Sequence, residues 1–196
     1  MSEDKPRLDP RIVRTRQLIK DALIELLQEM DIEKITVNRI AERATINRVT
    51  FYLHYRDIPD MFEKMAEEMV GNIQRVLNAD PSKPDAGDKM DTHMIVKLLE
   101  HIAENSKFYK VVLGPGRAPV FRERLLKLLS EIIQQRTMWD KDEYYGSKAG
   151  VSKEIAMWYG PSVLIGIIIA WIRSDFPYTP HYLAEQLSLL LLDKDG

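Results

Sequence analysis

The chain has 196 residues, of which 45% are hydrophobic and 30% charged, a composition typical of a soluble globular protein. Its net charge of −2 argues against a protein coated by nucleic acid, and its lack of cysteine excludes disulfides, thiolate metal sites and a cysteine nucleophile. The polar start MSEDKPRLDP does not resemble a signal peptide, and the longest apolar run, residues 163–172, is about half of a ~20-residue membrane span. We therefore expect a cytoplasmic protein.

Basic residues cluster near the start of the chain. Between residues 5 and 20 there are six basic side chains and one acidic side chain, Asp9, which gives this segment a net charge of +5. Such a cluster on an otherwise acidic chain fits an arm that contacts phosphates. The solvated face of a first helix fits the same charges, and the charge alone does not decide between them. The basic residues are Lys5, Arg7, Arg11, Arg14, Arg16 and Lys20.

Apolar residues at intervals of three and four predict an amphipathic helix over residues 10–30. A short break at residues 31–34 separates it from a second helix, which Thr36 caps and which ends near Ala44. A third short helix is expected over about residues 48–54. The residues expected to point inward from the first two helices are Leu18, Ile19, Ala22, Leu23, Leu26, Leu27, Met30, Val37, Ile40 and Ala41.

A fourth helix is expected to begin near Pro59, whose missing N–H suits a first turn, and to continue to about residue 78. Residues 79–90 hold two prolines and one glycine and are interpreted as a linker, and residues 137–150 as a loop. No stretch alternates as a strand does, so the predicted fold class is all-α with about nine helices. Beyond the linker, helices are predicted over residues 91–105, 108–113, 120–136, 152–174 and 180–193.

Three helices and the start of a fourth within 80 residues fit a helix-turn-helix module, with its motif at residues 36–55. Ala41 is small where two helices cross, and Ile46 is an apolar plug in the turn. On this spacing, Val49 and Phe51 point back toward the first helix. The residues then left for DNA are Arg48, Thr50, Tyr52 and His54.

The stretch ITVNRIAERATINRVTFYLHYRDIPDMF resembles the signature of the TetR family of bacterial transcription regulators. The resemblance covers about residues 11–70. It rests on an apolar-Thr start, an Ile-Ala pair and a Thr-aromatic-Tyr-x-His-aromatic segment, followed by a helix with an acidic residue in its first turn. The matching residues are Thr36, Ile40, Ala41, Ile46, Thr50, Tyr52, His54 and Tyr55.

The resemblance implies roles for residues of the second helix and of the turn. Thr36 corresponds to a residue that caps the helix against a phosphate. Asn38 and Arg39 occupy positions that reach the groove or the backbone of DNA. Asn47 corresponds to the cap of the recognition helix.

The third helix carries the implied DNA-reading residues. Arg48 and Val49 match base-reading positions with Thr50 beside them, and Tyr52 and His54 match residues that clamp the sugar-phosphate backbone. A guanidinium can pair with guanine O6 and N7 for roughly 1–3 kcal/mol of discrimination, so we expect Arg48 to set base specificity. The alternatives are a phosphate contact or a solvent-facing side chain for Arg48, and packing within the protein for Tyr52 and His54.

The chain departs from the family pattern at three positions. Thr45 stands where the family usually has glycine, and Val49 where it often has a small residue. Ile58 replaces a common lysine that meets a phosphate from the start of the fourth helix. That contact is then missing, or Arg56 supplies it.

Residues 152–174 are apolar around more than one helical face, which indicates a partner beyond the core of one domain. Pairing with residues 180–193 across a two-fold axis would form a four-helix dimer interface. The alternative is that residues 152–174 are simply the central helix of one domain. The segment IIIAWIRSDFPYTP loosely resembles dihydroxyacetone-kinase operon regulators, a subgroup of the family.

The resemblance also implies a small-molecule effector, although no cofactor is expected. Methionine and aromatic side chains can line an adaptable apolar pocket, and ordinary core packing explains the same residues. A protein partner in place of a small-molecule inducer is the alternative. The candidate ligand-binding residues are Met65, Met69, Phe108, Tyr109, Trp158 and Tyr159, with Met61 and Trp139 as further candidates.

No catalytic motif is recognisable, and His93 and His101, eight residues apart, do not have a metal-ligand spacing. We expect neither enzyme activity nor a metal site. The predicted function is a homodimeric, ligand-responsive repressor on a palindromic operator, with an activator or co-regulator as the alternative. The predicted parts are a DNA-binding domain at residues 10–57, a connecting helix at 58–78 and a regulatory and dimerisation domain at 91–193.

Overall fold

The computed structural model describes residues 9–78, 92–114, 119–136 and 150–192. Over these residues the chain forms nine α-helices, one short 3-10 helix and no strand, which confirms the predicted all-α class. The predicted linker at residues 79–90 and nearly all of the predicted loop at 137–150 lie outside the described residues. The chain divides into two compact units, Met1–Lys64 and Met65–Gly196, and the division falls within the fourth helix.

The first unit contains α1 (Pro10–Glu29), a 3-10 helix (Ile32–Lys34), α2 (Val37–Arg43), α3 (Arg48–Tyr52) and the start of α4 (Ile58–Asn78). The carboxylate of Asp9 caps α1 by accepting the N–H of Arg11 at 2.8 Å, and proline occupies the first turn, where its missing N–H has no helical partner. The side chains fully enclosed in this unit are Ile19, Leu23, Leu27, Ile40, Phe51 and Met61.

The inward face of α1 differs from the prediction at one residue. Leu18 was expected to point inward, and its side chain is 43% exposed, so this prediction was wrong. Successive helical residues are about 100° apart, and the core is met by the row through Ile19, Leu23 and Leu27. Leu18 therefore lies beside the buried stripe rather than within it.

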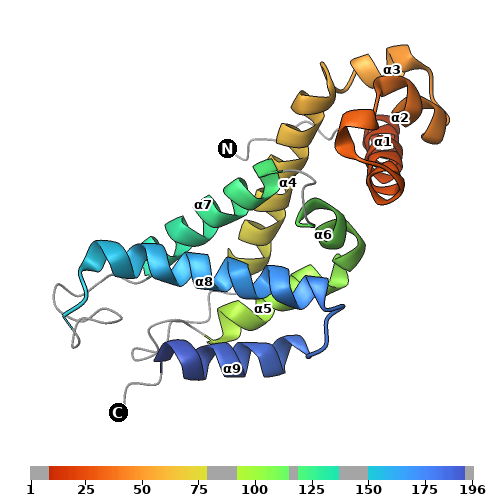
Figure 1. Ribbon diagram of the computed structural model, residues 1–196. Coiled ribbons are helices and arrows are strands. Elements are labelled where there is room, and N and C mark those ends of the chain that lie inside the picture. The colour runs from red at the N-terminus through yellow and green to blue at the C-terminus, as the bar shows by residue number, and fades with distance from the viewer. Residues whose placement is uncertain (1–8, 79–91, 115–118, 137–149, 193–196) are drawn as a thin grey trace. The chain divides into compact units, whose positions relative to one another are not determined.

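The second unit contains the rest of α4 with α5 (Thr92–Glu104), α6 (Ser106–Val112), α7 (Pro119–Arg136), α8 (Lys153–Arg173) and α9 (Pro180–Leu192). Within it, α5 packs along α9 and α7 packs along α8, as the ribbon shows (Figure 1). Side chains from six helices meet in its core, and the large buried ones include Ile73, Ile95, Leu99, Ile102, Tyr109, Phe121, Leu125, Ile168 and Leu187.

The turn between α8 and α9 holds two residues in the left-handed region, Asp175 with a φ of 61° and Phe176 with a φ of 57°. This conformation costs a residue with a side chain roughly 1–2 kcal/mol. Trp171 supports the turn, because its ring meets Phe176 edge-on at 4.7 Å and its Nε1 donates to the carbonyl of Tyr178 at 2.9 Å. Lys110 of α6 pairs with Asp175 and lies 5.3 Å from the Phe176 ring centre, which ties the turn to α6.

Of the helices that the structure describes, α8 alone is long and apolar enough, over Glu154–Arg173, to pass as a membrane span. The core helix of a soluble protein passes the same test of length and composition. Leu164, Ile168 and Trp171 of α8 are buried within the second unit, so we interpret α8 as a core helix.

Candidate DNA-binding site

The helix α2 begins at a side-chain cap. Thr36 has an extended backbone, and its Oγ1 accepts the N–H of Arg39 at 3.3 Å, which confirms the predicted cap. Thr36 and the neighbouring Asn38 are both exposed. A hydroxyl and amide N–H groups at an exposed helix start are suited to a phosphate oxygen. The phosphate contact itself stays a prediction.

Backbone hydrogen bonds close the turn between α2 and α3. The N–H of Thr45 donates to the carbonyl of Glu42 at 3.1 Å, and the N–H of Ile46 donates to the carbonyl of Ala41 at 2.9 Å. Thr45 has a φ of 55°, in the region that glycine enters without a steric cost. The position where the sequence departs from a family glycine is thus one where the backbone requires glycine-like geometry. Ile46 is half-buried beneath the turn.

The helix α3 has five residues and is oriented by its cap and one buried ring. The Oδ1 atom of Asn47 accepts the N–H of Val49 at 2.9 Å, which confirms the predicted cap. Phe51 is fully buried, whereas Val49 is 65% exposed, so the expectation that both point toward α1 was wrong for Val49. Two residues apart on a helix means about 200° of rotation, so only one of them can face the core.

The outer side of α3 presents a row suited to the edges of bases. Arg48 is exposed, and no described side chain forms a hydrogen bond or ion pair with its guanidinium. Val49 lies beside it, and Tyr52, one turn further, is 50% exposed. Thr50 is half-buried. Leu53, 77% exposed, continues this surface. We did not predict Leu53, because an apolar residue at a helix end is expected in the core.

The residues that follow α3 lie near basic groups. His54 is half-buried, and burial, together with the charge of Arg16, lowers the pKa of its imidazole. A neutral imidazole can still donate one N–H to a phosphate. The interaction also places Arg16 of α1 within electrostatic reach of the end of α3. Lys64 donates to the carbonyl of His54 at 3.2 Å and lies 5.6 Å from the ring centre of buried Tyr55.

The start of α4 is capped by a pair of aspartates. The Oδ1 atom of Asp57 accepts the N–H of Asp60 at 2.7 Å, and Asp60 accepts the N–H of Arg56 at 2.9 Å, which lowers the pKa of the Asp60 carboxyl. The Arg56 side chain is 81% exposed and pairs with Asp57, with Nε 3.3 Å from Oδ2. It is available to replace the lysine that Ile58 displaces, and this role stays a prediction.

Two arginines of α2 are engaged within the first unit. Arg43 forms a two-pronged pair with Glu29 at 2.8 and 2.6 Å, which lowers the pKa of the Glu29 carboxyl. Arg39 donates to the carbonyl of Lys34 at 3.1 Å and so braces the 3-10 turn. Arg39 would have to leave this contact to reach DNA, whereas Arg48 would not.

The predicted ligand-binding residues do not share one enclosed site. Tyr109 is fully buried, with its ring edge-on to Phe108 at 5.2 Å and to His101 at 5.9 Å. Its hydroxyl has no hydrogen-bond partner among the described residues, and burial raises its pKa. The remaining candidates divide into buried Met65 and Met69, half-buried Phe108, and exposed Trp158 and Tyr159. Their role in binding stays a prediction.

Three relatives of known sequence or structure resemble this chain. It is 25% identical over 183 residues to YxbF, an uncharacterized helix-turn-helix transcriptional regulator of Bacillus subtilis. This match covers 90% of this chain but only 44% of YxbF. A TetR regulator from Streptococcus agalactiae matches with a TM-score of 0.67 and 21% identity over 92% of this chain and 95% of its own. DhaS, a dihydroxyacetone kinase operon activator, matches with a TM-score of 0.58 and 20% identity over 93% and 96%. The two structural matches establish the fold.

Two family models match the chain and together cover both units. The model of the bacterial regulatory proteins of the tetR family matches residues 19–65, which include the whole motif from Thr36 to Tyr55. The model of a transcriptional regulator C-terminal region matches residues 92–193, just over half of the chain. Caps, turn and exposed recognition row agree with these matches, and the chain belongs to the TetR family of transcriptional regulators.

Proposed function

We propose that the chain binds operator DNA by placing α3 in the major groove and regulates transcription of nearby genes. The observation that carries this proposal is the exposed row of Arg48, Val49 and Tyr52 on a helix held by a cap and a buried ring. Arg48 is its only basic residue and would pair with guanine, while Val49 would contact a thymine methyl group.

Phosphate contacts would position this row on the duplex. Thr36 and the start of α2 would meet one phosphate, and Tyr52 and His54 would clamp the backbone on the other side of the groove. Arg16, which lies within electrostatic reach of His54, would add charge there, and Arg56 would take the place of the lysine lost at Ile58. Arg39 would contact DNA only after its hydrogen bond to the carbonyl of Lys34 is broken.

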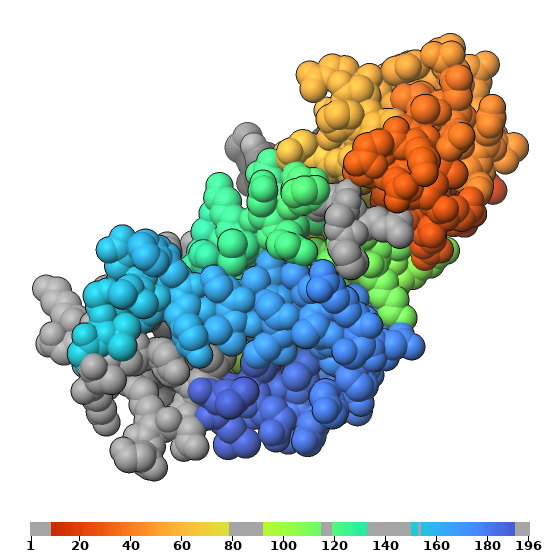
Figure 2. Space-filling view, in the orientation of Figure 1, coloured from red at the N-terminus to blue at the C-terminus, as the bar shows by residue number. Residues whose placement is uncertain are grey.

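The proposed active form is a homodimer formed through α8 and α9. These helices lie open to the viewer in the space-filling view (Figure 2). They expose large apolar side chains that a second copy of the chain would cover, which are Ile155, Trp158, Tyr159, Tyr182, Leu189 and Leu190. The two recognition helices would then read a palindrome, with half-sites about one DNA turn, ~34 Å, apart.

The proposal also includes the sign of regulation and the effector. We propose a repressor released by a small molecule. Activation, or control by a protein partner, is the alternative, and the name of DhaS describes an activator. The chain would act in the cytoplasm, where its DNA is. We propose no catalytic activity, since the family consists of regulators. This chain spans less than half of the length of the YxbF relative.

Selection of bound sequences from random DNA, followed by gel-shift titration, tests the proposal. The chain should enrich a palindrome, and Arg48→Ala should lose roughly 1–3 kcal/mol of preference at one base pair of each half-site. Lys20→Ala, in the basic stretch of α1, serves as the matched control. It should keep the sequence preference and reduce only the dependence of affinity on salt. Failure to enrich any sequence, together with monomeric behaviour in solution, would overturn the proposal.

A further inference from the structure

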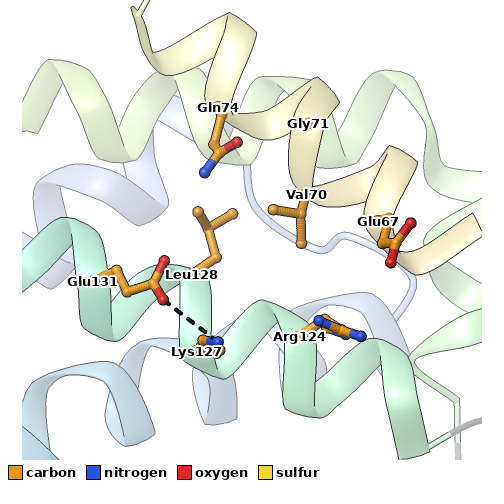
Figure 3. A pocket seen from close by; sticks show the side chains of 8 residues that line it. All are labelled: Glu67, Val70, Gly71, Gln74, Arg124, Lys127, Leu128 and Glu131. Carbon is orange, nitrogen blue, oxygen red and sulfur yellow. Dashed lines mark ion pairs between the residues drawn. The ribbon is translucent and has the colours of Figure 1, made fainter. Parts of the chain in front are cut away.

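A groove of about 220 Å³ lies between α4 and α7 within the second unit. Figure 3 shows that side chains from both helices line it. None of them is among the residues that the sequence suggested for a ligand. They are Glu67, Val70, Gly71 and Gln74 from α4, and Arg124, Lys127, Leu128 and Glu131 from α7.

One side of each helix lines the groove. The lining residues on α4 and on α7 both follow the spacing i, i+3, i+4, i+7, which places four side chains in one row over two turns. In both rows the middle holds an apolar or small residue, with Val70 and Gly71 on α4 and Leu128 on α7. Charged and amide side chains occupy the ends of both rows, and Lys127 lies next to Leu128 in the middle of the α7 row. The groove therefore has an apolar floor and a polar rim.

Gly71 keeps the floor of the groove open. A Cβ atom built on Gly71 would meet nothing within 4 Å, so an alanine fits there without a clash. Glycine inside a helix is roughly 0.5–1 kcal/mol less favourable than alanine. The chain thus carries the less stable residue where a side chain would begin to fill the groove, and this favours a function for the empty space.

The rim presents both signs of charge, two carboxylates and two cations. In Figure 3, Glu67 and Arg124 lie at one end of the groove, on opposite helices. Lys127 and Glu131 form an ion pair at 3.9 Å, longer than the roughly 2.7–2.9 Å of a direct charged hydrogen bond. The Lys127 side chain is 70% exposed, so its ammonium can turn to a ligand at little cost.

We infer that the α4–α7 groove binds a small dipolar molecule that carries an anionic group and an ammonium group. The anionic group would meet Lys127, and the ammonium group would meet the carboxylates of Glu67 and Glu131. A molecule with one charge would complement only one sign of charge on this rim. The volume is below the roughly 300–1,000 Å³ of drug-sized sites, so the ligand has few heavy atoms.

The regulatory consequence of this site rests on the proposed function. Glu67 to Gln74 belong to α4, and the same helix begins at Ile58 in the first unit, directly after the recognition motif. A ligand that joins α4 to α7 would restrain the helix that carries the DNA-binding unit. The difference between the ligand's affinities for the DNA-free and the DNA-bound forms would set the size of the response.

Calorimetric titration of the full chain with O-phosphoethanolamine, in a phosphate-free buffer at neutral pH, tests the inference. This probe carries a phosphate and an ammonium group on two carbons, and we expect millimolar or tighter binding. Inorganic phosphate alone and ethanolamine alone should each bind at least tenfold more weakly. Lys127→Gln should weaken binding of the probe at least tenfold, whereas Arg122→Gln, an exposed arginine of α7 outside the groove, should change it less than twofold.

Gly71→Leu adds a steric test, because the new side chain enters the groove and should abolish binding of the probe. Circular dichroism checks that this variant folds, and Lys127→Gln, an exposed change, keeps the test decisive if it does not. Absence of binding by O-phosphoethanolamine, or equal binding by Lys127→Gln and Arg122→Gln, would overturn the inference. Equal binding of inorganic phosphate would show a simple anion site and would overturn it as well.

Gel shifts without the probe separate this inference from the proposed function. If the chain does not bind O-phosphoethanolamine but still binds DNA, only the effector site is refuted. Probe binding by a chain that selects no DNA would refute the proposed function and leave the groove standing.

Discussion

The short helix α3 of the first unit and the long helix α8 of the second both expose apolar side chains, but they are held in different ways. A five-residue helix is not stable alone, so α3 depends on the Asn47 cap and on buried Phe51. The 21-residue α8 packs along α7 with many buried residues. Single substitutions at Asn47 or Phe51 should therefore disrupt the exposed surface of α3. In contrast, α8 should keep its structure after a substitution at its surface and lose only the binding of a partner there.

Removal of the Phe51 ring should have the largest effect. The side chain is fully buried, and Phe51→Ala should destabilise the first unit by about 3–5 kcal/mol through lost burial and a cavity. Urea denaturation followed by circular dichroism measures this loss. Tyr52→Ala, at a half-exposed neighbour, should cost less than about 1 kcal/mol and weaken only DNA binding. Equal losses in the two variants would show that α3 does not depend on its buried ring.

A charge placed on α8 should separate the subunits without unfolding the chain. Trp158 is 63% exposed, and Trp158→Glu should weaken the proposed dimer by about 2 kcal/mol or more, roughly 30-fold in the dissociation constant. Sedimentation velocity at several concentrations measures the change, and melting temperature is the check on folding. Arg122→Glu introduces the same side chain on α7 and should leave the dimer intact. An unchanged dimer in Trp158→Glu would place the interface elsewhere.

Relief of backbone strain in the turn should stabilise the first unit. Thr45 has a φ of 55°, and Thr45→Gly should raise the free energy of unfolding by roughly 1 kcal/mol, since glycine enters this region without a clash. Thr50→Gly, within α3, is the control and should lower stability instead. Thermal or urea unfolding measures both. A loss of stability in Thr45→Gly would mean that the threonine side chain supports the turn in a way its backbone does not reveal.

Replacement of the buried Tyr109 hydroxyl should change the stability least, and the size of the change should depend on pH. The hydroxyl has no hydrogen-bond partner among the described residues, so Tyr109→Phe should be neutral or stabilise by up to about 1 kcal/mol. Burial raises the pKa of Tyr109 above its ordinary value, about 10, so ionisation favours the unfolded chain. Its contribution is complete below about pH 10 and is lost as the pH rises beyond that.

Tyr109→Phe should remove this alkaline loss, which urea unfolding at pH 8 and pH 10.5 would detect. Tyr182→Phe alters a tyrosine that is 48% exposed and should not gain stability. A marked loss of stability in Tyr109→Phe would reveal a bound water or ligand at the hydroxyl.

The helices, most of their ends and the caps at Thr36 and Asn47 could be predicted because they depend on residues within three or four positions along the chain. The end of α3 and the start of α6 each differ from the prediction by two residues. The motif of the DNA-binding unit is local for the same reason. The predicted helix over residues 152–174 differs from α8, Lys153–Arg173, only at its capping residues. Periodicity and capping chemistry alone therefore determined the fold class and the recognition helix.

Only the tertiary structure decided which helical faces meet. It buried Phe51 and left Val49 exposed, and it engaged Arg39 with the carbonyl of Lys34. It likewise buried Tyr109 and left Trp158 exposed. It also brought residues 67–74 and 124–131 together as the two sides of one groove. Such pairings join helices that are far apart in the sequence, and packing of the whole core selects among faces that a single helix presents with similar hydrophobicity.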